Sequence, residues 1–144
     1  MGSFAGICFE LGIGIAVGML AGTTGTHGSA RGRMTILAAV IGLLLGALLS
    51  GTADVELVAG AVFAAIGAVF ACLVVSDVVG GAARREGSGS GALAFLVSLT
   101  ALVVLAISIL IAPAVPLIVA ALLWLALSRR RRAQRKHAGL RVLR

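Results

Sequence analysis

The sequence predicts an all-α integral membrane protein with five transmembrane helices. Of its 144 residues, 60% are hydrophobic and only 12% are charged, with a mean hydropathy of +1.17. A soluble domain normally has about a quarter of its residues charged. None of the twelve Lys and Arg residues lies inside an apolar run. We therefore expect lipid, and not water, to face most of the surface.

The first three apolar runs are residues 4–22, 34–51 and 57–79, and each carries small residues at intervals of four. That spacing places the small residues on one helix face, where another backbone can approach closely. We expect residues 1–79 to form a three-span unit in which the first two runs pack on each other. The predicted packing residues are Gly14, Gly18, Gly22, Gly42, Gly46 and Gly60.

Three polar segments connect these runs. Residues 23–33 are rich in Gly, Thr and Ser and contain Arg31 and Arg33, which predicts a loop. Residues 52–56 form a short acidic connection. Residues 80–91, with the sequence GGAARREGSGSG, lack apolar periodicity and predict a flexible cytoplasmic linker.

Residues 92–128 are almost continuously apolar, which predicts a transmembrane hairpin. A single helix of that length would extend about 55 Å, whereas the hydrocarbon core is roughly 30 Å thick. Pro113 and Pro116 supply the break, because proline lacks the amide donor and disfavours helical geometry in the preceding residue. Residues 129–144 form a basic cytoplasmic tail.

The distribution of basic residues sets the expected topology. With five spans, the two basic connections and the basic tail lie on one side, and the N-terminus, the acidic connection and the proline turn lie on the other. The positive-inside rule then places the N-terminus outside and the C-terminus in the cytoplasm, in a multi-pass protein of the cell inner (cytoplasmic) membrane. The last span is short, so four spans with a re-entrant hairpin is the alternative.

Glu10 is the principal candidate for a functional site, because it lies about two turns into the first span. An ionisable side chain within a membrane is costly enough to indicate function by default. We expect it to be protonated, hydrogen-bonded, or neutralised by a cation or cationic substrate. By depth, its expected neighbours are Leu44, Val62 and Leu105, with Ser108 the nearest polar group. The alternative is a protonated, hydrogen-bonded residue near the outer interface with no further role.

A lone glutamate in the first span of a small, glycine-rich protein is similar to the small multidrug-resistance transporters, whose glutamate exchanges protons for cationic drugs. Those proteins have four spans and a pocket lined with aromatic residues. This chain has no Tyr and a single Trp, Trp124, so the family is not assigned. Asp54 and Glu56 would attract cations to the outer mouth. Their alternative role is an ordinary solvated turn that stabilises a helix N-terminus.

The basic tail is expected to contact anionic phospholipid headgroups, where each charge contributes about 1 kcal/mol. The alternative role is a plain topology anchor. Nucleic acid is not an expected partner, because no aromatic residues that could stack on bases are interleaved. The predicted lipid-contacting residues are Arg129, Arg130, Arg131, Arg132, Arg135 and Lys136.

Catalytic and cofactor motifs are not found in the sequence. It has no nucleophile elbow, no phosphate-binding loop, no paired carboxylates with a base and no cluster of metal ligands, so we expect neither an enzyme, nor a cofactor, nor a metal site. Cys8 and Cys72 are too few for a disulfide framework and are expected at opposite depths.

The expected function is transport or translocation of a small ion or of a cationic or lipid substrate. Glu10 would be the proton or cation site, in an oligomer formed through the first glycine face. The alternative is a structural subunit or assembly partner of a larger membrane complex. A holin-like or lipid-binding protein is a third hypothesis.

Overall fold

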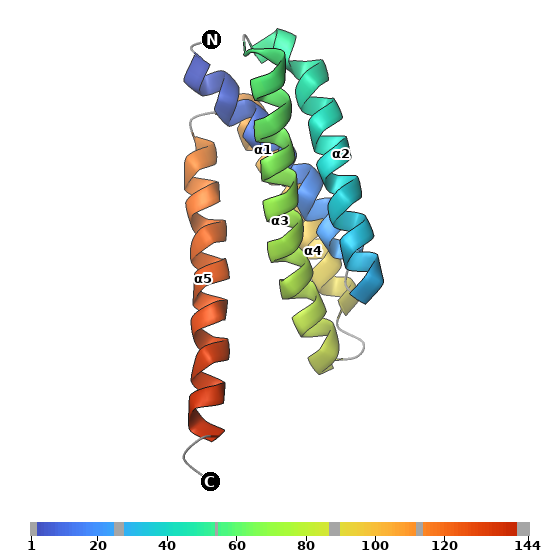
Figure 1. Ribbon diagram of the computed structural model, residues 1–144, viewed down its shortest axis with the longest axis vertical. Helices are drawn as coiled ribbons and strands as arrows, with labels where there is room; N and C mark the ends of the chain where they lie inside the picture. Colours follow the sequence, from blue (N-terminus) through green and yellow to red (C-terminus); the bar gives the residue numbers. More distant parts are fainter. Residues whose placement is uncertain (1–2, 25–27, 54, 87–89, 112–113, 141–144) are drawn as a thin grey trace.

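In the computed structural model, the described chain comprises residues 3–24, 28–53, 55–86, 90–111 and 114–140, and it is almost entirely helical. The helices are α1 (Ser3–Thr24), α2 (Gly28–Ala53), α3 (Leu57–Glu86), α4 (Ser90–Leu110) and α5 (Val115–Leu140). Successive helices run in opposite directions, so α1 begins and α5 ends at opposite ends of the molecule (Figure 1). The predicted all-α class is confirmed.

Four of the described helices are long and apolar enough to cross a membrane. These candidate spans are Phe4–Thr24, Ala30–Thr52, Leu57–Ala82 and Gly91–Leu110. The apolar part of α5, Val115–Ser128, is shorter. At 1.5 Å per residue it extends about 21 Å, against a hydrocarbon core of roughly 30 Å. The prediction of a membrane protein is therefore supported by four spans, and the fifth crossing stays a prediction.

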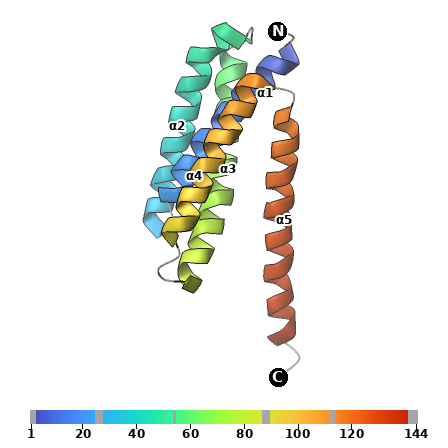
Figure 2. The ribbon, with the colours of Figure 1, turned by 180° about the vertical axis from the view of Figure 1, so that it is seen from behind.

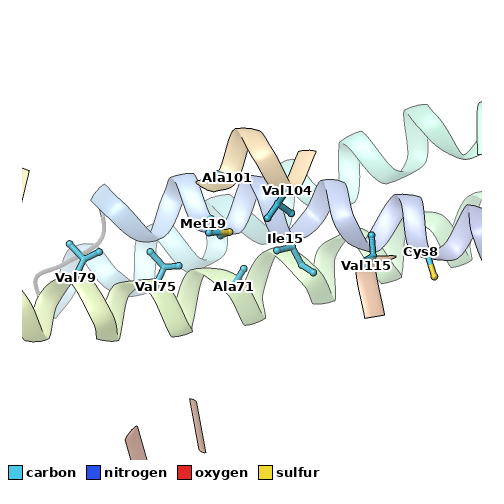
Figure 3. Close-up of a cluster of buried hydrophobic side chains, with 9 residues drawn as sticks. All are labelled: Cys8, Ile15, Met19, Ala71, Val75, Val79, Ala101, Val104 and Val115. Carbon is cyan, nitrogen blue, oxygen red and sulfur yellow. The ribbon is translucent and has the colours of Figure 1, made fainter. Parts of the chain in front are cut away.

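Helices α1 and α3 form the interior of the bundle. In the most apolar stretch of each helix, the buried share is 56% in α1 and 50% in α3. It is only 22% in α2 and 17% in α4. The main core cluster joins α1, α3 and α4 to the start of α5 (Figure 3). Its buried members are Cys8, Ile15, Met19, Ala71, Val75, Val79, Ala101, Val104 and Val115. The outer faces of α2 and α4 are therefore left to lipid.

Helices α1 and α2 contact each other as predicted, but the glycine face of α1 packs on α3. A Cβ added at Gly14 would overlap the backbone carbonyl of Ala64, and one added at Gly18 would overlap that of Ala68. A Cβ added at Gly42 of α2 would lie 2.9 Å from the Cβ of the same Ala68. Helix α3 is thus the shared partner, because its alanines are small on the sides that face both α1 and α2.

Two connections are shorter than predicted, because the neighbouring helices continue into them. α1 extends to Thr24, where the Thr23 and Thr24 hydroxyls donate to the carbonyl oxygens of Leu20 and Ala21 at 2.7 and 2.9 Å. α2 then begins at Gly28, so that Arg31 and Arg33 are helical. α3 likewise continues through most of the predicted linker. Glycine and serine do not end a helix when neighbouring elements hold it.

The acidic connection and the proline break lie where the sequence predicts them. α2 ends at Ala53 and α3 begins at Leu57, and the amide of Val55 donates to the carbonyl oxygen of Ser50 at 3.2 Å. α4 ends at Leu110 and α5 begins at Val115; Pro113 lies outside the described residues. Pro116 occupies the first turn of α5, where the missing amide breaks no helical hydrogen bond.

Helix α5 stands beside the bundle and contacts it along one side only (Figures 1 and 2). Val115 is fully buried, and Ile118, Val119 and Leu122 pack against the core cluster. The other side of α5 is exposed, with Trp124 72% accessible. The helix continues through the basic segment to Leu140, so the first part of the predicted tail is helical.

Candidate functional site

Glu10 lies inside the bundle, with 0% of its surface exposed. Its carboxyl carbon lies 3.5 Å from the position that a Cβ would take at Gly60, at the start of α3. The same position lies 3.1 Å from the Cβ of Ser50 and 3.3 Å from the carbonyl oxygen of Gly46, both on α2. Two glycines and one serine therefore make the room in which the carboxyl group lies.

The packing of α1 on α3 forces Glu10 into this position. α1 and α3 run in the same direction, and residues Gly14 and Gly18 contact Ala64 and Ala68 at successive turns. Glu10 is one turn before Gly14, and Gly60 is one turn before Ala64. Residues four apart share a helix face, so the contact that brings the two glycines to α3 also brings Glu10 to Gly60.

Neither carboxyl oxygen of Glu10 has a hydrogen-bond partner among the described residues. The hydroxyl of Ser50 donates instead to the carbonyl oxygen of Ala47 at 2.9 Å. A buried polar group without a partner costs about 1–3 kcal/mol, and an isolated buried charge costs far more. Glu10 is therefore the least satisfied group in the described interior.

Two of the neighbours predicted for Glu10 from membrane depth, Leu44 and Val62, lie outside the interior. Leu44 and Val62 are 55% and 46% exposed and point away from the bundle. Ser108 is buried, but it lies against Gly12, where its Cβ is 2.6 Å from the position of an added Cβ. Its hydroxyl donates to the carbonyl oxygen of Val104 at 2.8 Å. Depth alone does not define how each helix is rotated about its own axis.

The acidic connection lies at the same end of the bundle as Glu10. Glu56 is exposed, and its carbonyl oxygen accepts a hydrogen bond from the amide of Gly60 at 2.9 Å. The two residues are four apart on the chain, so Glu56 is one turn closer to the end of the bundle than Gly60. Asp54, the other predicted mouth residue, lies outside the described residues.

The remaining predicted packing glycines also lie in the interior. A Cβ at Gly22 would lie 2.8 Å from the Cβ of Val75, and one at Gly46 would lie 2.6 Å from the carbonyl oxygen of Gly60. All six predicted packing glycines therefore face a neighbouring helix of the same chain.

An ion pair at the opposite end of the bundle was not predicted. Nη1 of Arg31, in the first turns of α2, lies 2.7 Å from Oδ1 of Asp77 near the end of α3. The side chains are 39% and 59% exposed. The sequence did contain a signal for this pair. Asp77 is the lone acid in the apolar run 57–79, and that run ends on the same predicted side as the segment that contains Arg31.

The basic residues predicted to contact lipid lie on the last turns of α5. Arg131 is exposed. The side chains of Arg129, Arg130, Arg132, Arg135 and Lys136 are not described, although their backbone is helical. The helix therefore carries these residues past the apolar segment at the end of the molecule where α3 ends (Figure 1).

The two cysteines are free and buried, Cys8 in the core cluster and Cys72 between α2 and α3. The sulfur of Cys72 lies 3.8 Å from the hydroxyl oxygen of Thr35. Within the described part of the chain, no group of three His, Cys, Asp or Glu residues could hold a metal ion.

No protein-family model, curated protein or solved structure matches this chain.

Proposed function

We propose that the chain is a small membrane transport protein in which Glu10 binds and releases a proton or a cation. The observation that supports this function is a fully buried carboxyl group without a hydrogen-bond partner among the described residues, inside a candidate membrane span. A group placed there only for packing would be apolar. An ionisable group kept at such a cost in the membrane is best explained by the exchange of charge.

The proposed orientation places the Glu10 end outside the cell and the basic end in the cytoplasm. α2 begins and α5 ends at the same end of the molecule, which brings Arg31, Arg33 and Arg131 to one side (Figures 1 and 2). The acidic connection with Glu56 lies at the other side. The positive-inside rule supports a location in the cytoplasmic membrane with this orientation.

An oligomer remains part of the proposal, but not through the glycine face of α1. Gly14, Gly18 and Gly22 are occupied by α3 within the same chain. Copies of the chain, or a partner subunit in a larger complex, would have to meet another surface, such as the exposed apolar faces of α2 and α4. The assembly-partner alternative would likewise have to use such an exposed face.

The basic turns of α5 are proposed to contact anionic headgroups. The apolar part of the helix is too short to cross the hydrocarbon core unaided, and arginine side chains can extend toward headgroups. Trp124, one turn before the arginines, is suited to the interface, because its ring is apolar and its N–H is polar.

The proposed function is tested by ion flux in liposomes that contain the purified protein. Glu10→Gln keeps the size of the side chain and removes its ability to ionise, so flux should be lost while the protein still folds. Glu56→Gln is the matched control, because it changes an exposed acid at the mouth and should retain most of the flux. Flux that is unchanged in Glu10→Gln would remove Glu10 from the mechanism.

A further inference from the structure

Resting on the transport function proposed above, we infer that the ion bound by Glu10 is a proton, and neither a metal ion nor an organic cation. Three features of the site support this inference: the space around the carboxyl group, the oxygen atoms available to a cation, and the position of other charged groups.

The carboxyl group is enclosed at van der Waals distance. Its carbon lies 3.5 Å from the Cβ position of Gly60, and its residue has no exposed surface. One turn deeper, the backbones of Gly14 and Ala64 touch. An organic cation would have to separate α1 from α3 at a point where even one added methyl group overlaps a carbonyl. A proton adds no volume.

The site supplies too few oxygen ligands for a metal ion. Calcium takes six to eight oxygen atoms, and magnesium requires an octahedral set. Besides the two carboxyl oxygens, the polar side chain shown to border this space is Ser50, whose hydroxyl already donates to the carbonyl oxygen of Ala47. The carbonyl groups of α2 and α3 around it are engaged in helical hydrogen bonds. A proton needs no ligand beyond the carboxylate itself.

In the described structure, no positively charged group lies near Glu10 to stabilise its ionised form. Apart from Glu10, neither α1 (residues 3–24) nor α4 (residues 90–110) contains a charged residue. The only charged group described at this end of α3 is the acidic Glu56. The other charged residues of the neighbouring helices belong to turns at the far end of the bundle. They are Arg31 and Arg33 on α2, Asp77, Arg84, Arg85 and Glu86 on α3, and the basic residues in the last turns of α5.

The distance to those groups is large. Ser50 lies nineteen positions after Arg31 on α2, which corresponds to about 28 Å along the helix. An ionised Glu10 would therefore be an uncompensated charge in a low-dielectric interior, and protonation is the change that removes it with the atoms at hand.

Infrared difference spectroscopy of the full-length protein in lipid tests this inference. A protonated carboxyl group has a C=O stretching band distinct from those of carboxylates and amides. The spectrum of the native protein minus that of Glu10→Gln should contain this band at mildly acidic pH in sodium-free buffer. The spectrum of Glu56→Gln should still contain this band. In D₂O the band of the native protein should shift to lower frequency, because the exchangeable carboxyl proton is replaced by deuterium.

Cation competition separates the alternatives. Sodium, potassium, magnesium or tetraphenylphosphonium, added at constant pH, should leave the band unchanged. Loss of the band on addition of one of them would overturn the inference and identify that cation as the ligand. Absence of the band at mildly acidic pH, or a band that does not shift in D₂O, would also overturn it. These outcomes are independent of flux, so transport and proton occupancy can fail separately.

Discussion

The substitution Gly14→Ala tests whether the backbones of α1 and α3 are in contact. The new Cβ would overlap the carbonyl oxygen of Ala64, and it would lie 2.7 Å from the carbonyl carbon and 2.8 Å from Cα. Ordinary contact begins near 3.4 Å. The helices would therefore have to separate locally by more than 0.7 Å, which is the shortfall of 2.7 from 3.4 Å at the carbonyl carbon alone. Overpacking of this kind typically costs about 1–3 kcal/mol.

Gly32→Ala is the matched control. An added Cβ at Gly32, in the first turns of α2, meets nothing within 4 Å. There the substitution should be neutral or should stabilise the helix by roughly 0.5–1 kcal/mol, because alanine loses less backbone entropy than glycine on forming a helix. Because both variants replace glycine by alanine on a helix, the propensity gain cancels, and they should differ in stability by the overpacking cost of about 1–3 kcal/mol.

Equilibrium unfolding in mixed micelles measures this difference. The fraction of denaturing detergent is increased, and unfolding is followed by circular dichroism and by the fluorescence of Trp124, the only tryptophan. Gly14→Ala should unfold at a lower detergent fraction than the native protein, and Gly32→Ala at the same fraction or a higher one. Equal stability of the two variants would show that α1 and α3 do not touch at Gly14, and the placement of Glu10 beside Gly60 would have to be withdrawn with it.

Three further predictions concern other parts of the molecule. A double-mutant cycle of Arg31→Gln and Asp77→Asn should show a coupling of about 0.2–1 kcal/mol in the free energy of unfolding. The coupling should fall at high salt, because the pair is partly exposed. A larger coupling that is insensitive to salt would contradict a screened surface pair. Cys8 and Cys72 should resist maleimide in the folded protein and react after denaturation, and rapid labelling in the native state would show that the core opens. The fluorescence of Trp124 should be quenched by lipids brominated near the headgroup, and quenching by aqueous iodide instead would place α5 outside the bilayer.

The fold class and most helix ends could be predicted, because they depend on the length and hydropathy of each run. The proline break and the acidic connection are examples, since proline and a polar turn act locally. The two glycine-rich connections were predicted too long. Glycine, serine and threonine near a membrane surface are compatible with both loop and helix, and tertiary contacts decide, such as the pair between Arg31 and Asp77 across the ends of α2 and α3.

Glu10 could be identified from sequence, but its surroundings could not. The apolar runs are hydrophobic on all sides, so hydropathy does not reveal which face is buried. Small residues do reveal a face, and Gly14 and Gly18 indeed lie in close helix contact. Their partner could not be chosen in advance, because the second and third runs both carry small residues at the same interval. That choice places Gly60, and not Leu44, beside the carboxyl group.

The packing beyond Glu10 constrains how an ion could cross the bundle. The polar side chains buried in the described interior are Glu10, Ser50, Ser76 and Ser108, and Ser50 borders the space at Glu10. Past Glu10, α1 and α3 are in backbone contact at two successive turns. Passage from Glu10 to the basic end is therefore blocked in this conformation and requires α1 to move relative to α3. Transport by such a movement predicts slow, saturable flux in liposomes. Flux that rises linearly with the driving force at channel-like rates would show that ions bypass the contact between α1 and α3.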